Sequence, residues 1–226
     1  MTSMKHLIFL LILTARECKC DDHGIEIVVS DSVNGPNYNV ENEVDGTDIF
    51  EHKYCLLSCV DQSRANCQSA IRKAMDEWDG KFVNSALKKH NQELKFTIHQ
   101  HCCKKRRRGA RKDEISIDGY IIKQECVDLI INFVKPGDPN SPFRQRSGIM
   151  YDGSDDLKKI LLNDEENFTT RRITDMIGHE LGHFLGLCDN REEESIMCTT
   201  CANTRVEDVD VENLLEVLKK RKQQNT

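Results

Sequence analysis

The pattern of apolar and polar residues predicts alternating strands and helices in the first half of the chain. Residues 54–60 are apolar enough for a strand, and residues 127–134 are typical of a fully buried one. A half-buried strand is predicted where apolar and polar residues alternate, at Leu94, Phe96 and Ile98. An amphipathic helix ending at Gly80 is predicted from residues that recur on one helical face, namely Ile71, Ala74, Met75 and Trp78.

The second half of the chain predicts further elements of both kinds. A strand is expected at 148–152, another segment at 157–163, and then a helix that is capped near Thr169 or Thr170. A last helix, with Asp208 or Asp210 as its cap, is predicted from Val211, Leu214, Leu215 and Leu218. This order predicts an α+β fold in which a mixed sheet is backed by helices.

The helix that begins near residue 170 has an apolar face and an opposite face with two histidines. At 100° per residue, the side facing away from His179 and His183 consists of Ile173, Ile177, Leu181, Phe184 and Leu185. The histidines are therefore expected to face a cleft rather than the core.

The segment between His179 and Asp189 combines residues that can hold and use a zinc ion. His179 and His183 are four residues apart, so on a helix both rings lie on one face, about 6 Å from each other. Glu180 is placed to accept a proton from metal-bound water as a general base. Gly186 can adopt the left-handed conformation that turns the chain back, and Asp189 then follows as a third ligand.

The spacing H-E-x-x-H-x-x-G-x-x-D, followed by Met197, resembles the metzincin clan of zinc endopeptidases. That clan has a methionine turn beneath the metal, and Met197 is the matching residue. Most members have histidine where this chain has Asp189, and the snapalysins are similar to this chain in having aspartate. The resemblance implies one catalytic Zn²⁺, hydrolysis of peptide bonds, and a metzincin-like fold with a twisted sheet, an active-site helix and a small C-terminal subdomain.

The resemblance extends over roughly residues 48–220 and looks closest to the upper subdomain of matrixin-type members. In that family an edge strand pairs with extended substrate. The matching candidate in this chain consists of Gly148, Ile149, Met150 and Tyr151. An ordinary hairpin strand is the alternative interpretation of these residues.

Length and composition indicate a single domain, and the N-terminal residues indicate secretion. With 226 residues and 38% hydrophobic content, the chain can bury a substantial core, and its net charge of −6 argues against nucleic acid as a partner. An apolar run at 7–13 is too short to span a membrane and is typical of a signal peptide within 1–20, cleaved after Ala15 or after Cys20. Residues 21–47 are then a flexible leader or a short pro-segment, and 48–226 the protease domain.

The 11 cysteines favour disulfide bonding in an oxidising compartment, with one thiol left over. A bridge from Cys188 to Cys198 or Cys201 would tie the loop around Asp189 to the methionine turn. A zinc knuckle formed by the same three cysteines is the less favoured alternative.

Three weaker signals lie outside the zinc motif. The basic run from Lys104 to Lys112 could bind sulfated polysaccharide or be a solvated loop. His99 and His101 are interpreted as exposed histidines, because the ligand spacing of an auxiliary zinc site is missing. Asn167 begins an N-glycosylation sequon.

Two rival functions remain open at this stage. A thermolysin-like protease would keep both histidines and take its third ligand from a downstream helix, with Glu207 or Glu212 as candidates. A catalytically dead, secreted protein would instead use the basic run to hold matrix polysaccharide.

Overall fold

A computed structural model of the chain describes residues 48–57, 64–90, 92–105, 114–117, 119–134, 149–152, 157–163, 169–198 and 205–224. The described helices are α1 (Arg64–His90), α2 (Thr170–Leu185) and α3 (Asp208–Gln224). The larger sheet contains β1 (Asp48–Leu56), β2 (Gln92–Ile98), β6 (Leu129–Val134), β7 (Ile149–Asp152) and β8 (Lys158–Asn163). A smaller sheet contains β3 (Cys103–Lys105), β4 (Glu114–Ile117) and β5 (Tyr120–Lys123), and short 3₁₀ turns lie at Gln100–Cys102 and Gln124–Cys126.

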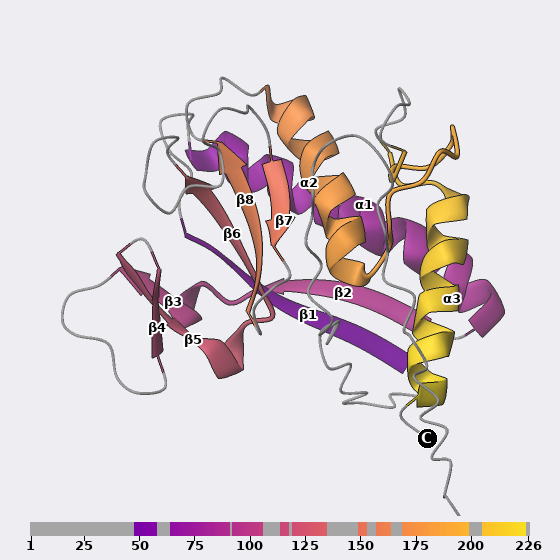
Figure 1. The fold of residues 1–226 in the computed structure, drawn as a ribbon, viewed down its shortest axis with the longest axis horizontal. Coiled ribbons are helices and arrows are strands. Elements are labelled where there is room, and N and C mark those ends of the chain that lie inside the picture. Colours follow the sequence, from indigo (N-terminus) through magenta and orange to yellow (C-terminus); the bar gives the residue numbers. More distant parts are fainter. Residues whose placement is uncertain are drawn as a thin grey trace, which may run out of the picture.

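The larger sheet is mixed, as predicted, and its strand order is β2-β1-β6-β8-β7. The pairs β1 with β2, β1 with β6, and β6 with β8 are parallel. In the described sheet only β7 is antiparallel to its neighbour, β8. The strand order places β7 at one edge of this sheet. Figure 1 shows β7 next to α2, and it shows the smaller sheet on the opposite side of the larger sheet from α3. The protein therefore has an α+β fold in which a largely parallel sheet is backed by helices.

Alternating side chains on the central strands bury both faces of the larger sheet. Phe50 and Tyr54 of β1 belong to the main core, which they share with residues of all three helices. Cys55 of β1 and Ile130 of β6 point the other way, into a second cluster that includes residues of the smaller sheet. Because these strands are covered on both faces, β6 has no polar side, and its one polar residue, Asn132, is itself buried.

Both bounds of the first predicted strand and the end of the first predicted helix are wrong. The first strand begins at Asp48 rather than at residue 54, and it ends at Leu56. Its early part includes His52, which is only 2% exposed and packs between the rings of Phe96 and Phe184. Because this histidine at a core position interrupts the apolar pattern, hydrophobicity alone predicts the start of the strand too late in the sequence.

The first helix continues ten residues past its predicted end at Gly80 and stops at His90. Phe82, which is fully buried, extends the apolar face beyond the glycine. Burying a phenylalanine contributes roughly 1.5–3 kcal/mol, whereas a glycine inside a helix costs roughly 1 kcal/mol. Packing therefore outweighs local helix propensity at Gly80.

Other predicted elements are confirmed. The half-buried strand corresponds to β2, the fully buried one to β6, and the segment at 157–163 to β8. The second helix has Thr169 as its N-cap, whose side chain accepts a hydrogen bond from the Arg172 N–H at 3.2 Å. The last helix starts at Asp208, so Asp208 and Asp210 lie in its first turn.

Several predictions fall on residues outside the described ranges. These include the signal segment, the leader, Gly148, Asn167, Cys201 and most of the basic run, of which Lys104 and Lys105 are exposed in β3. Within the described ranges, no helix combines the length and apolar character that crossing a membrane requires.

Candidate metal centre

Helix α2 carries the two histidines on a face turned away from the core. Its opposite face is buried as the sequence predicts, through Ile173, Ile177, Leu181, Phe184 and Leu185. Trp78 of α1 fixes the helix in place, because its buried indole N–H donates to the Gly178 carbonyl at 2.8 Å. The His179 and His183 rings are left partly exposed, with centroids 4.8 Å apart.

A left-handed residue ends α2 and reverses the chain. Gly186 has φ of 102° and ψ of 19°, which only glycine adopts without strain. Its N–H donates to the His183 carbonyl at 2.9 Å, and the Leu187 N–H donates to the Gly182 carbonyl at 2.9 Å. This pair of bonds is a Schellman motif, and it directs the next residues back along the histidine face.

Asp189 meets both histidines at the end of this turn. Its Oδ1 atom lies 3.2 Å from His179 Nε2 and 3.3 Å from His183 Nε2. The candidate ligand atoms of the three residues all lie within 4.8 Å of one another. The side chains of His179 and Asp189 are 23% and 21% exposed, so the cluster is reachable from solvent.

Backbone carbonyls determine which nitrogen of each ring faces the cluster. His179 Nδ1 donates to the Ile196 carbonyl at 2.8 Å, and His183 Nδ1 donates to the Leu187 carbonyl at 3.0 Å. A carbonyl can only accept, so each Nδ1 carries the proton and each neutral ring presents a lone pair at Nε2. Histidines that bind metals in proteins are oriented by the same kind of second hydrogen bond.

When both rings are neutral, three lone-pair-bearing atoms therefore converge with no hydrogen between them. Asp189 Oδ1 is buried and has no hydrogen-bond donor. When both histidines are neutral, only a cation can satisfy this oxygen together with the two Nε2 atoms. Two imidazoles and one carboxylate are a common ligand set for catalytic zinc, so these residues fit the predicted ion.

The pKa shifts describe the competition between a proton and a metal for this cluster. Burial alone would lower the pKa of His179, but a protonated ring can donate to Asp189, and this interaction and the charge of Glu180 outweigh burial and raise the pKa. Burial would raise the pKa of Asp189, yet the hydrogen bonds that protonated His179 and His183 can donate hold it well below its usual range. In both cases the cluster favours positive charge at its centre.

Met197 packs under the helix turn between the two histidines. It is 1% exposed, and a Cβ atom added at Gly182 would overlap its Sδ atom. A Cβ added at Gly178 would likewise lie 2.8 Å from Cδ1 of Ile196. The two glycines thus allow residues 196 and 197 to approach α2 closely enough for the Ile196 carbonyl to reach His179.

A buried carboxylate from α3 holds this turn in place. Asp210 is fully buried and accepts hydrogen bonds from the Ser195 hydroxyl, from the Ile196 N–H at 3.1 Å and from the Glu207 N–H at 2.8 Å. Ser195 Oγ in turn accepts from Asn190 Nδ2 at 2.8 Å, next to Asp189. One carboxylate therefore connects α3, the turn at residues 195–197 (called the methionine turn below) and the loop with the third candidate ligand.

The other predicted site residues lie apart from this cluster or outside the described ranges. Ile149, Met150 and Tyr151 form most of β7, whose neighbours in the fold include α2. Glu207 forms an ion pair with Lys81 at 2.9 Å. Cys188 and Cys198 are both disulfide-bonded, and the partner of each stays a prediction.

Sequence reasoning misses the groups that orient the ligands. Asp210 is predicted only as a helix cap, and the carbonyls of Leu187 and Ile196 carry no sequence signal at all. The Glu207 N–H donates to the Asp210 carboxylate three residues later, as the N–H of an N-cap residue does in a capping box.

Neither a protein-family model nor a curated protein matches the chain. Among solved structures, the chain is similar to the crystal structure of metalloproteinase-II from Bacteroides fragilis, with 12% sequence identity and a TM-score of 0.40. The likeness covers 74% of this chain and 52% of the other, so this chain spans about half the length of that protein. Because the TM-score is this low, the interpretation of the site depends on its own geometry.

Gly182→Ala should destabilise the protein by roughly 1–3 kcal/mol, because the added methyl group overlaps Met197 in a packed core. Gly80→Ala is the matched control: it lies inside α1 with open space at its Cβ, and should stabilise by up to about 1 kcal/mol. Urea unfolding measures both variants. Equal stability of the two variants would show that Met197 does not pack against α2 as described.

Asp210→Asn should lower the free energy of unfolding by roughly 1–3 kcal/mol, because the new amide group faces backbone N–H donors. It should also weaken metal binding by about 10–100-fold, since the methionine turn orients His179. Asp208→Asn, at an exposed residue on the same turn, should change stability by at most about 0.5 kcal/mol. Denaturant titration and metal competition against a chelator test both variants, and unchanged metal affinity in Asp210→Asn contradicts the role of this carboxylate.

Proposed function

We propose that the chain is a zinc-dependent endopeptidase of metzincin type. His179, His183 and Asp189 hold the ion, Glu180 is the general base, and Met197 supports the site from below. Zinc held there would lower the pKa of a coordinated water and polarise the carbonyl group of a peptide bond.

The observation that carries this proposal is that both Nε2 atoms approach one carboxylate oxygen without a hydrogen-bond partner, while both Nδ1 atoms face backbone carbonyls. Both rings are fixed by carbonyls, at 2.8 Å for His179 and 3.0 Å for His183, so neither can turn its proton toward Asp189 without losing a hydrogen bond. A structural cluster of exposed histidines would have no need of this orientation. The arrangement is expected of ligands that are prepared for a cation before it binds.

Glu180 gives the site its hydrolytic chemistry. It follows His179 directly on α2, is 7% exposed, and its charge acts on the pKa of His179. A carboxylate in this position can take a proton from the attacking water and later pass it to the leaving amine. The same ligand set also suits iron(II), so the choice of zinc is part of this proposal.

The edge position of β7 supports a protein or peptide as the substrate. In the described sheet β7 pairs on one side only, with β8, and α2 lies nearby (Figure 1). An extended peptide can add to such an edge as a further strand through backbone hydrogen bonds. We propose that residues 148–151 align the substrate in this way and bring its scissile bond to the metal centre.

The rival functions find less support. A downstream third ligand is disfavoured because Asp189 already completes the cluster, while Glu207 is engaged by Lys81. No contact of the described residues supports the other alternative, a catalytically dead protein that binds polysaccharide through its basic run. Secretion is part of the proposal, and the disulfides Cys55–Cys103 and Cys102–Cys126 agree with an oxidising environment.

Glu180→Gln should keep the metal, because Glu180 is not a ligand, and should lower the turnover number by roughly 10²–10⁴-fold, as loss of a general base does. The measurement is cleavage of a mixed peptide library together with metal analysis of the same samples. Loss of metal from the variant would show that the assigned role is wrong. A chelator should abolish cleavage by the unmodified protein, and added zinc should restore it.

Asp189→Ala should release most of the metal, because two histidines alone bind zinc weakly. Glu207→Gln is the control for a downstream ligand and should retain full metal occupancy. Mass spectrometry under native conditions, combined with elemental analysis, gives both the stoichiometry and the identity of the ion. Retention of zinc by Asp189→Ala, with loss from Glu207→Gln, would replace this proposal with the thermolysin-like alternative.

A further inference from the structure

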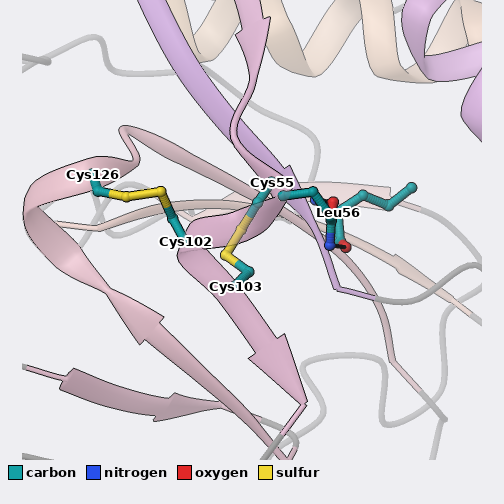
Figure 2. Close-up of a disulfide and its surroundings, with 6 residues drawn as sticks. Cys55, Leu56, Cys102, Cys103 and Cys126 are labelled. Atoms are coloured by element: carbon teal, nitrogen blue, oxygen red, sulfur yellow. Dashed lines mark hydrogen bonds between the residues drawn. A yellow bond between two sulfur atoms is a disulfide. The ribbon is translucent and has the colours of Figure 1, made fainter.

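A second group of ligand-type side chains lies at the end of β2, on other elements than the first. It consists of His99, His101, Cys102 and Cys126, whose candidate ligand atoms all lie within 4.8 Å of one another. The two imidazole rings have centroids 5.2 Å apart. Cys102 and Cys126 form a disulfide bond, which Figure 2 shows next to the Cys55–Cys103 bond.

The turn that carries three of these residues is attached firmly to β1. The His99 N–H donates to the Tyr54 carbonyl at 2.8 Å. The Gln100 side chain donates to the Leu56 carbonyl at 2.7 Å and accepts from the Leu56 N–H at 3.3 Å. These bonds involve neither sulfur nor imidazole, so the turn is held whether or not Cys102 is bonded to Cys126.

The two neighbouring disulfides differ in their exposure to a reductant. Cys55 and Cys103 are both buried, at 0% and 4% exposure. Cys102 is also buried, at 1%, but Cys126 is partly exposed at the end of its 3₁₀ turn. Because thiol–disulfide exchange needs access to a sulfur atom, the Cys102–Cys126 bond is the one open to attack, through Cys126.

We propose that reduction of the Cys102–Cys126 disulfide creates a second metal site, a Cys2His2 zinc site formed with His99 and His101. The reductant is an external dithiol. It supplies two electrons and two protons, becomes a disulfide itself, and leaves two thiols on the protein. Zinc binding then displaces one proton from each thiol, so that two thiolates and two neutral imidazoles hold the ion.

The geometry of the cluster suits this exchange. Tetrahedral zinc with Zn–S distances of about 2.3 Å and Zn–N distances of about 2.0–2.1 Å places its two sulfur atoms roughly 3.8 Å apart. After reduction, the two sulfur atoms therefore need to move apart only to this separation, which is shorter than the 4.8 Å within which the four candidate ligand atoms already lie. Oxidation and zinc binding exclude each other, because both use the same two sulfur atoms.

The test uses Co²⁺ in place of zinc, because cobalt held by thiolates shows a charge-transfer absorption that a site of histidine and carboxylate lacks. The full chain is treated with a dithiol, freed of it under nitrogen, and titrated with Co²⁺ beside an untreated sample. The treated protein should show the thiolate absorption and bind one more ion than the untreated protein. Alkylation mapping should find Cys102 and Cys126 reduced, and protected once the metal is bound.

Single substitutions separate this site from the first. His99→Ala and His101→Ala should each lower the cobalt affinity of the reduced protein at least tenfold, with the disulfide still forming on oxidation. His179→Ala should leave the thiolate absorption unchanged, so failure of the proposed protease site cannot be mistaken for failure of this one. Thiolate absorption that is unaffected by both His99→Ala and His101→Ala overturns the proposal, as does a reduced, folded protein without it.

Cys126→Asp covers the case in which reduction unfolds the protein. This variant has no Cys102–Cys126 disulfide, keeps the buried Cys55–Cys103 bond, and offers zinc or cobalt a carboxylate in place of one thiolate. It should bind the extra cobalt ion without any reductant and show absorption from the single thiolate. If it is folded and binds no extra ion, the four residues do not form a metal site.

Discussion

The metal centre depends on the left-handed turn at Gly186. That residue satisfies the last carbonyls of α2 and reverses the chain, so the same few residues supply both a carbonyl for His183 and the carboxylate of Asp189. A residue with a side chain at φ of 102° would cost on the order of 1 kcal/mol or more in backbone strain. A shift of this turn would displace Asp189 and break the hydrogen bond that orients His183.

The second half of the site is positioned from outside α2. His179 takes its orientation from the Ile196 carbonyl, and Ile196 is held by Asp210 of α3. The energy of a buried carboxylate is unfavourable unless its oxygens receive hydrogen bonds, and Asp210 receives three. The C-terminal helix thereby contributes to the site without touching it, since its carboxylate fixes the distance between the methionine turn and the helix with the histidines.

Sequence periodicity predicts the structure correctly where a single local interaction determines it. The apolar face of α2, the buried strand β6 and the glycine at 186 follow from helical spacing, two-sided burial and backbone conformation. Prediction fails where tertiary packing overrides local pattern, at His52 in the core and at Gly80 inside α1. The candidate ligands could be predicted because their spacing is local, whereas Asp210 acts across a separation of 14 or 15 residues that no local pattern encodes.

The two histidine clusters differ in what competes with a cation. At His179, His183 and Asp189 the competitor is a proton, because Oδ1 can be satisfied by a protonated ring or by a metal. At His99, His101, Cys102 and Cys126 the competitor is a covalent bond between two of the ligands. A reducing agent therefore acts on them in opposite ways. At the second cluster, reduction frees two thiols that can bind a metal. At the first cluster the candidate ligands contain no sulfur, so reduction can only break the disulfides of the neighbouring Cys188 and Cys198.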